Sequence, residues 1–149
     1  MKGKRVLITG GAGFVGSHTA DALMNAGHSV VIFDNLTPQV HQGNDPYLPD
    51  GTEFVCGDVR DLAKLSSVVK DAEVIYHLAA AVGVGQSMYQ ISEYTSSNNL
   101  GTANLFQAIL DTRATPEKIV VASSMSIYGE GKYLCGNCGE MAPSPRPLE

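Results

Sequence analysis

The sequence lacks the marks of a secreted or membrane-bound protein. Its 149 residues contain no tryptophan and three cysteines, an odd number with no secretion signal. An odd set of thiols cannot form a complete disulfide framework, so we expect a reducing compartment, the cytoplasm. The first apolar run stops at Gly10 and Gly11, too soon for a signal peptide, and no later run is long enough to span a bilayer. No membrane association is therefore expected.

Positive charge is also scarce. Ten lysines and arginines stand against fifteen aspartates and glutamates, which gives a net charge of −5. Surfaces that bind nucleic acid are strongly basic, so no nucleic-acid partner is expected. Hydrophobic residues at 44% and charged residues at 17% are ordinary for a globular protein, and 149 residues suffice for one domain with its own core.

What the chain does have is glycine at informative positions. An apolar, β-branched run at residues 6–9 leads into Gly10, Gly13 and Gly16, and a helical pattern follows. Gly10 can turn tightly with positive φ, Gly13 lets the backbone approach a pyrophosphate, and Gly16 lets the helix pack closely. The helix N-terminus offers free N–H groups to phosphates. The segment predicts a dinucleotide-binding turn.

An acid follows at the distance that such a turn needs. A second apolar run, residues 30–33, ends at Asp34, about 20 residues after the glycines. Its carboxylate can accept hydrogen bonds from the adenosine ribose and would repel a 2′-phosphate, and no arginine follows at residues 35–37. The sequence therefore favours NAD over NADP. Because we expect Asp34 at a strand tip facing the cleft, Asp34→Ala should barely alter stability.

Apolar runs alternate with helical patterns along the chain. Strands are predicted at residues 4–9, 29–33, 52–56, 73–77 and 118–123, and helices at about 14–26, 61–70 and 88–113. Such alternation predicts an α/β fold, a Rossmann-type doubly wound parallel sheet with helices on both faces. Residues 35–51 are predicted to form a long loop. The expected organisation is an NAD-binding domain, 1–129, and a loop or tail, 130–149.

Three further groups lie at predicted strand ends, where open parallel sheets bind ligands. After the third strand, the Asp58 carboxylate and the Val59 N–H can hydrogen-bond an adenine edge; Asp58 or Asp61 can also cap the next helix. His77 ends the fourth strand, and a single histidine there favours a structural role. Ser124 follows the fifth strand, where its hydroxyl would lie beside the nicotinamide and could hydrogen-bond substrate.

These motifs occur in the order typical of one family. Over residues 4 to about 129, the chain resembles the extended short-chain dehydrogenase/reductases, in particular NAD-dependent nucleotide-sugar epimerases and dehydratases. The resemblance rests on the glycine triplet, Phe-Asp-Asn, Gly-Asp-Val, His-Leu-Ala-Ala, Asn-Asn-Leu-Gly-Thr-Ala-Asn-Leu and Ser-Ser-Met-Ser-Ile-Tyr-Gly. It implies NAD contacts by Gly10, Gly13, Phe14, Val15, Asp34, Asn35, Asp58, Val59, Leu78, Ala79, Ala80 and Asn98. For Asn98, a structural role bonding neighbouring backbone remains an alternative.

The resemblance also implies an activity. A 4-epimerase of a UDP- or dTDP-sugar would use tightly bound NAD to oxidise the C4 hydroxyl transiently, with Ser124 as the catalytic hydroxyl. The alternatives are a 4,6-dehydratase, a reductase or a non-catalytic NAD-binding module. The dehydratase is less favoured because Met125 and Ser126 supply no acid after Ser124. A homodimer is implied through residues 88–113, with Met88, Ile91, Leu105 and Ile109 expected as exposed apolar side chains.

The family's general base is a tyrosine with a lysine four residues later on a helix, whose charge lowers the tyrosine pKa. The only such spacing here is Tyr128 and Lys132, and the two glycines between them make a poor helix. We therefore expect the genuine pair, and the substrate domain, beyond Glu149. The chain is interpreted as the N-terminal part of such an enzyme.

Cys135 and Cys138 have the C-x-x-C spacing of a zinc knuckle, in which two thiolates on a tight turn face one metal. Two ligands make half a tetrahedral site, so zinc would need a second pair outside this chain. The alternatives are two incidental cysteines or a redox pair, although no helical pattern follows to lower a thiol pKa.

Overall fold

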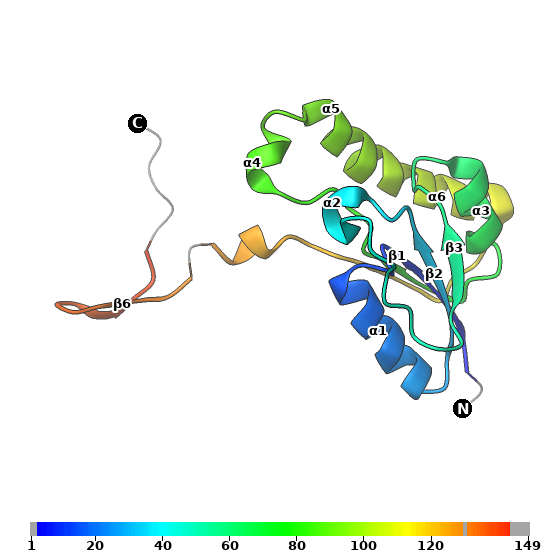
Figure 1. Cartoon of the computed structure of the whole chain (residues 1–149), viewed down its shortest axis with the longest axis horizontal. Coiled ribbons are helices and arrows are strands. Elements are labelled where there is room, and N and C mark those ends of the chain that lie inside the picture. The colour runs from blue at the N-terminus through cyan, green and yellow to red at the C-terminus, as the bar shows by residue number, and fades with distance from the viewer. Residues whose placement is uncertain (1–2, 130, 144–149) are drawn as a thin grey trace.

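The computed structural model describes residues 3–129 and 131–143. Five parallel strands form the central sheet in the order β3-β2-β1-β4-β5 (Figure 1). They are β1 (Arg5–Thr9), β2 (Ser29–Asp34), β3 (Glu53–Cys56), β4 (Val74–His77) and β5 (Lys118–Val121). The chain reverses its direction of travel across the sheet between β1 and β4, so a crevice is expected at the carboxyl ends of these strands.

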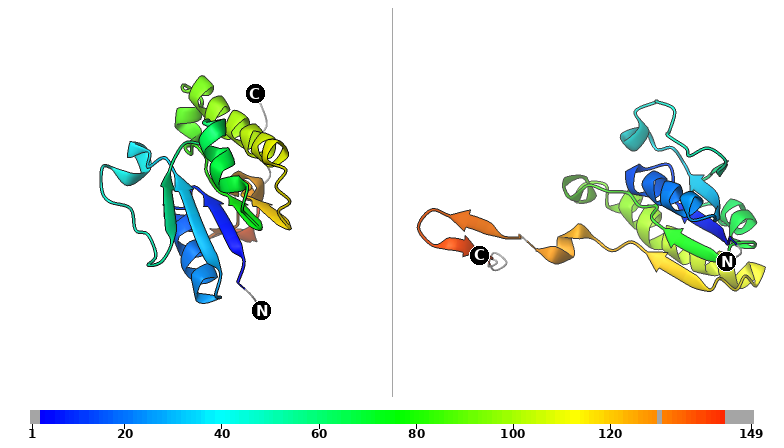
Figure 2. Two further views of the ribbon diagram at one scale, coloured as in Figure 1. Left: turned by 90° about the vertical axis from the view of Figure 1, so that its right-hand side faces the viewer. Right: turned by 90° about the horizontal axis from the view of Figure 1, so that it is seen from below.

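Helices cover both faces of the sheet, as predicted. The helix α1 (Phe14–Asn25) packs on one face, and α3 (Leu62–Val69) and α6 (Gly101–Thr112) pack together on the other (Figures 1 and 2). Strand side chains alternate between these faces: Leu7 joins the core under α3 and α6, whereas Ile8 joins the core under α1. The central strands are apolar on both faces, as a doubly covered parallel sheet requires.

Two predicted segments differ in detail. Residues 35–51 hold a short helix, α2 (Pro38–His41), which proline starts at its first position and Gln42 ends with a φ of +51°. The predicted helix at 88–113 corresponds to α5 (Ile91–Tyr94), the π-helical turn η1 (Thr95–Leu100) and α6, which follow one another without a gap. The short helix α4 (Val84–Ser87) precedes the predicted range. The glycine and proline content of residues 35–51 gave no indication of α2, and apolar periodicity could not predict the π-helical turn η1.

The end of the described chain is a hairpin rather than the predicted loop. After the short helix η2 (Met125–Tyr128), β6 (Tyr133–Cys135) pairs with β7 (Gly139–Met141) in antiparallel register, and Lys132 forms an ion pair with Glu140. The hairpin stands apart from the sheet (Figures 1 and 2). Such short strands have too few residues for a readable alternation. Residues 144–149 of the predicted tail lie outside the described residues, and the domain limits 1–129 stay a prediction.

None of the described helices is both long enough and apolar enough to cross a bilayer.

Candidate functional site

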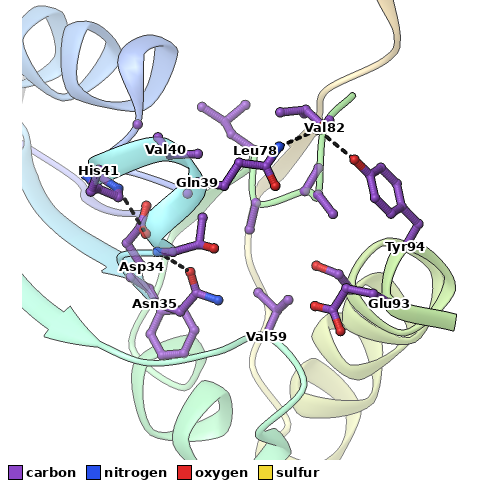
Figure 3. Close-up of a pocket in the computed structure, with 18 of the residues that line it drawn as sticks. Asp34, Asn35, Gln39, Val40, His41, Val59, Leu78, Val82, Glu93 and Tyr94 are labelled. Carbon is purple, nitrogen blue, oxygen red and sulfur yellow. Dashed lines mark hydrogen bonds and ion pairs between the residues drawn. The ribbon is translucent and has the colours of Figure 1, made fainter. Parts of the chain in front are cut away.

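A cavity of about 260 Å³ opens at the carboxyl ends of the strands. Its walls are the glycine turn, the β2 end with α2, the segment after β3, and residues 78–97 (Figure 3). Eight of the predicted cofactor residues line it: Gly10, Gly13, Asp34, Asn35, Val59, Leu78, Ala79 and Ala80. Residues from four separate segments therefore converge on one hollow.

The three glycines of the turn meet different surroundings. Gly10 has a φ of +70°, and a Cβ there would lie 2.7 Å from the Ala79 nitrogen. A Cβ on Gly16 would lie 2.3 Å from the Gly10 carbonyl oxygen. At Gly13 it would meet only that oxygen, at 3.4 Å, so the space in front of the α1 N-terminus is open to a ligand. Two glycines serve the close packing of the turn, and one leaves room for a phosphate group.

Asp34 is held in a fixed orientation. The N–H groups of Ala12 and Leu36 donate to Oδ2 and Oδ1 of its carboxylate, at 3.1 and 2.9 Å. His41 Nε2 lies 3.8 Å from Oδ1 (Figure 3). With 8% exposure, Asp34 is buried, not merely at a strand tip. The expectation that Asp34→Ala barely affects stability is therefore corrected, because two backbone donors would lose their acceptor.

Asp58 does not line the cavity, but it holds Asn35, which does. Its carboxylate accepts hydrogen bonds from Asn35 Nδ2 at 2.9 Å and from the Arg60 side chain at 2.7 Å. Chiefly through the Arg60 hydrogen bonds, the pKa of the Asp58 carboxyl is held well below its usual range. Arg60 Nη1 also donates a hydrogen bond to Glu93 Oε1 at 2.8 Å. Asp61, not Asp58, caps α3, and a direct adenine contact by Asp58 stays a prediction.

His77 belongs to a buried network, in agreement with its predicted structural role. The Thr102 hydroxyl donates to the Asn98 carbonyl, so its oxygen accepts from His77 Nε2 at 3.0 Å. Thr9 accepts from the Ala79 N–H and faces His77 Nδ1 at 2.7 Å, so its hydroxyl donates to that nitrogen. Burial lowers the pKa of His77. The neutral ring joins β1, β4 and α6.

Asn98 uses its side chain on the backbone. Its Oδ1 accepts from the Ala81 N–H at 2.7 Å, and its Nδ2 donates to the Ala81 carbonyl at 3.1 Å. Asn98 does not line the cavity, whereas Ala81 does. This is the structural alternative raised from the sequence: the side chain fixes the loop after β4, and a direct contact with a cofactor stays a prediction.

Other predicted site residues are not brought into the cavity. Phe14 and Val15 are 80% and 62% exposed on the first turn of α1. Ser124 is exposed beyond β5, where its hydroxyl oxygen accepts from the Ser126 N–H and caps η2. Tyr128 is 86% exposed at the end of η2 and not on a helix shared with Lys132. This geometry agrees with the interpretation that Tyr128 and Lys132 are not the general-base pair.

The sequence analysis missed two groups of lining residues: Thr37, Gln39, Val40 and His41 around α2, and Gln90, Glu93, Tyr94 and Ser97 along α5 and η1. The second group has the spacing i, i+3, i+4, i+7, which places its members on one helical face. That polar stripe was a usable signal. The first group had none, because its segment was interpreted as a loop.

The two cysteines of the C-x-x-C segment, both free thiols, lie at the tip of the β6–β7 hairpin. Cys135 ends β6, and Gly139 after Cys138 takes a φ of +75°. Hydrogen bonds from the backbone N–H groups of Asn137 and Cys138 and from the Cys138 side chain lower the pKa of the Cys135 thiol. Across the described residues, no group of three or more metal-ligating side chains is assembled.

The sequence of residues 6–146 matches the NAD dependent epimerase/dehydratase family. The chain belongs to this family. Among its curated relatives is a dTDP-L-rhamnose 4-epimerase of Burkholderia thailandensis, 37% identical over 137 residues, covering 89% of this chain and 38% of that protein. Another is a UDP-N-acetyl-alpha-D-glucosaminuronate decarboxylase of Bacillus cytotoxicus, 37% identical, covering 86% of this chain and 39% of that protein.

Members of the epimerase/dehydratase family are also its structural neighbours. A UDP-glucose 4-epimerase from Brucella ovis in complex with NAD superposes with a TM-score of 0.71 and 33% identity. The match covers 85% of this chain and 37% of that one. The present chain therefore spans less than half the length of these family members, and the fold and family are shared over that part.

Proposed function

We propose that this chain is the NAD-binding part of a nucleotide-sugar 4-epimerase that acts on a UDP- or dTDP-sugar. The observation that carries the proposal is the cavity in which the open space at Gly13 and the fixed carboxylate of Asp34 face the same hollow. The relatives support it, since a dTDP-L-rhamnose 4-epimerase shares 37% identity and a UDP-glucose 4-epimerase of the same fold is in complex with NAD.

The residues present fit a dinucleotide. The N-terminus of α1 at Gly13 would hold the pyrophosphate, and Asp34 would accept from the adenosine ribose hydroxyls. Asn35 and Val59 line the cavity and would contact the adenine. The loop at Leu78 to Ala80, held by Asn98 through Ala81, also lines the cavity and would contact the other half of the dinucleotide. When bound, NAD supplies a hydride acceptor for the sugar C4–H and later returns the hydride. We assign Ser124 to hydrogen-bond the sugar, and the general base to residues outside this chain.

The alternatives within the family are a 4,6-dehydratase or a reductase, and outside catalysis a non-catalytic NAD-binding module. The decarboxylase among the relatives indicates that this N-terminal part serves several reactions. The missing acid after Ser124 favours the epimerase over the dehydratase.

The test is an assay of the natural full-length protein with UDP-glucose, UDP-glucuronate and dTDP-rhamnose, with products separated chromatographically. We expect the C4 epimer of one of these sugars without net consumption of NAD. A 4-keto-6-deoxy product would establish the dehydratase instead, and NAD binding with no product from any sugar would favour the module.

We further propose a homodimer in the cytoplasm. The exposed apolar side chains that support the dimer are Ile91, Leu100, Phe106 and Leu110 along α5 to α6. This corrects part of the expected set: Met88 and Ile91 are exposed, whereas Leu105 is fully buried and Ile109 packs against the core. A monomer by light scattering of the full-length protein at micromolar concentration would contradict the dimer.

The three free cysteines support a reducing compartment, as proposed with the cytoplasm.

A second candidate is half a zinc site at Cys135 and Cys138. The hairpin favours it, because the turn presents both thiols on one exposed tip and backbone N–H groups point at the Cys135 sulfur. Zinc analysis of the full-length protein tests it: we expect bound zinc that Cys135→Ser releases. A metal-free protein purified with zinc present would contradict it.

A further inference from the structure

The two walls of the cavity are joined across its mouth by side chains outside the glycine turn. Gln39, on α2, donates through Nε2 to the Val82 carbonyl at 3.2 Å and to Gln86 Oε1 at 2.6 Å. The Tyr94 hydroxyl, on α5, reaches the same two acceptors at 2.8 and 3.3 Å. Figure 3 shows Gln39 and Tyr94 approaching Val82 from opposite sides. These four residues, here called the clasp, link segments more than 40 positions apart.

Three of the four clasp residues line the cavity, and the backbone beside the clasp is shaped to allow its contacts. Gln39, Val82 and Tyr94 line the same hollow as Gly13 and Asp34. Gly83, with a φ of +127°, lies beneath it: a Cβ there would lie 2.7 Å from Gln86 Oε1 and 3.0 Å from the Tyr94 hydroxyl. Because glycine has no Cβ, Gln86 Oε1 and the Tyr94 hydroxyl can both lie close to the backbone at this position, so the loop backbone is adapted to the contact.

From this arrangement we infer that Gln39 and Gln86 form a retaining bridge that must open before a dinucleotide enters or leaves the cavity. The inference rests on the proposed function. In a 4-epimerase the same cofactor takes the hydride and gives it back, so loss of the reduced cofactor in mid-reaction would end the cycle. A bridge over the cavity mouth slows that loss. The bridge is made by protein side chains alone and is present before the cofactor binds, so it slows entry as well.

The hydrogen bonds of Gln39 lead to a specific prediction for the rates of cofactor entry and release. Exposed hydrogen bonds of this kind are weak singly, so removal of the bridge should raise both rates by about fivefold to tenfold. The dissociation constant should then stay within about twofold, because entry and exit change together. Gln39 makes both hydrogen bonds across the mouth, to Val82 and to Gln86, so Gln39→Ala and the double variant should have the same effect. Gln86→Ala keeps the bond from Gln39 to Val82 and should raise the rates by no more than Gln39→Ala does.

The experiment is stopped-flow measurement of NADH binding and release, by its fluorescence, on the 149-residue chain and these three variants. Gln107→Ala is the matched control, since Gln107 makes a similar surface hydrogen bond to Asp111 at 2.7 Å on α6, outside the cavity. Circular dichroism confirms that each variant is folded.

Faster entry and release in Gln39→Ala and in the double variant, with an unchanged control, would support the bridge. Weaker binding with an unchanged entry rate, multiplying in the double variant, would show separate cofactor contacts and overturn it. Rates equal to those of the unaltered chain would also overturn it. Absence of NADH binding by the unaltered chain would instead contradict the proposed function, and the bridge with it.

Discussion

The two ends of the sheet's carboxyl edge are built differently. Around β1, β2 and β4 the polar side chains are buried and paired: Asp34 and His77 are 8% and 4% exposed, and each has its partners within the protein. Beyond β5 the chain is open to solvent, with Met125 and Tyr128 both 86% exposed. Ser124 there contacts its own turn.

This difference between the two ends matches two different tasks, the binding of a cofactor and the chemical step. A site that recognises a dinucleotide needs groups fixed before the ligand arrives, and the β1–β2–β4 end has them. A site that transfers a proton needs a base beside the reacting atom, and the segment after β5 has no tyrosine–lysine pair in place among the described residues. We therefore propose that this chain holds a self-contained NAD site and only one side of a catalytic site.

The largest effect is expected within the glycine turn. Gly16→Ala should destabilise the fold by about 3 kcal/mol, because its Cβ would collide with the Gly10 carbonyl oxygen at 2.3 Å. Gly13→Ala is the matched variant: its φ of −74° suits alanine and its Cβ meets nothing closer than 3.4 Å. It should keep the stability and weaken NAD binding. Urea unfolding and calorimetry measure the two effects, and equal stability losses would contradict this division.

The next effect separates cofactor binding from folding at Asp34. Asp34→Ala should weaken NAD binding about 10- to 100-fold, since it removes charge-assisted hydrogen bonds to the ribose, and should narrow the preference against NADP. It should also lower the free energy of unfolding by about 1–3 kcal/mol, because the Ala12 and Leu36 N–H groups lose their acceptor. Calorimetry with both cofactors and urea unfolding give the two numbers. An unchanged NAD affinity would undo the assignment.

A smaller effect is expected from pH. Burial lowers the pKa of His77 from its ordinary 6.5, so the unfolded chain takes up the proton first as the pH falls. The contribution of neutral His77 to the free energy of unfolding is fully present above pH 6.5. It is lost as the pH falls toward the pKa of His77 in the folded protein, by no more than about 1.4 kcal/mol per pH unit. Urea unfolding at pH 7.5 and 5.5 measures the loss. His77→Asn should be less stable at pH 7.5 and lose less on acidification; an equal loss in both proteins would place the titrating group elsewhere.

The smallest effect on this chain is expected at the β5 end. Ser124→Ala should leave NAD affinity within about twofold. A residue outside the cavity should contribute no more than about 0.4 kcal/mol to NAD binding. In the full-length protein the same change should lower kcat about 100-fold if Ser124 hydrogen-bonds the reacting sugar. Calorimetry and a sugar assay test the pair. A large loss of NAD affinity would move Ser124 into the binding site.

The parts that the sequence could predict are those governed by strong local rules. The parallel sheet with helices on both faces follows from alternation and crossovers, and the places of Gly10 and Asp34 in the cavity follow from spacing and chemistry. The burial of Leu105 and the clasp at Gln39 could not be predicted. The first depends on which helical face meets α3, and the second on a contact between segments 47 positions apart. Asn98 shows an intermediate case, since the residue was found but its partner, Ala81, was not.

The most direct measurement is isothermal titration calorimetry of NAD into the 149-residue chain, followed by the sugar assay on the same sample. We expect saturable binding of one NAD per chain, weaker binding of NADP, and no epimer from any sugar tested. Absence of NAD binding would contradict the self-contained site. Sugar turnover by this chain alone would contradict the separation of binding from chemistry and return Tyr128 and Lys132 to the catalytic centre.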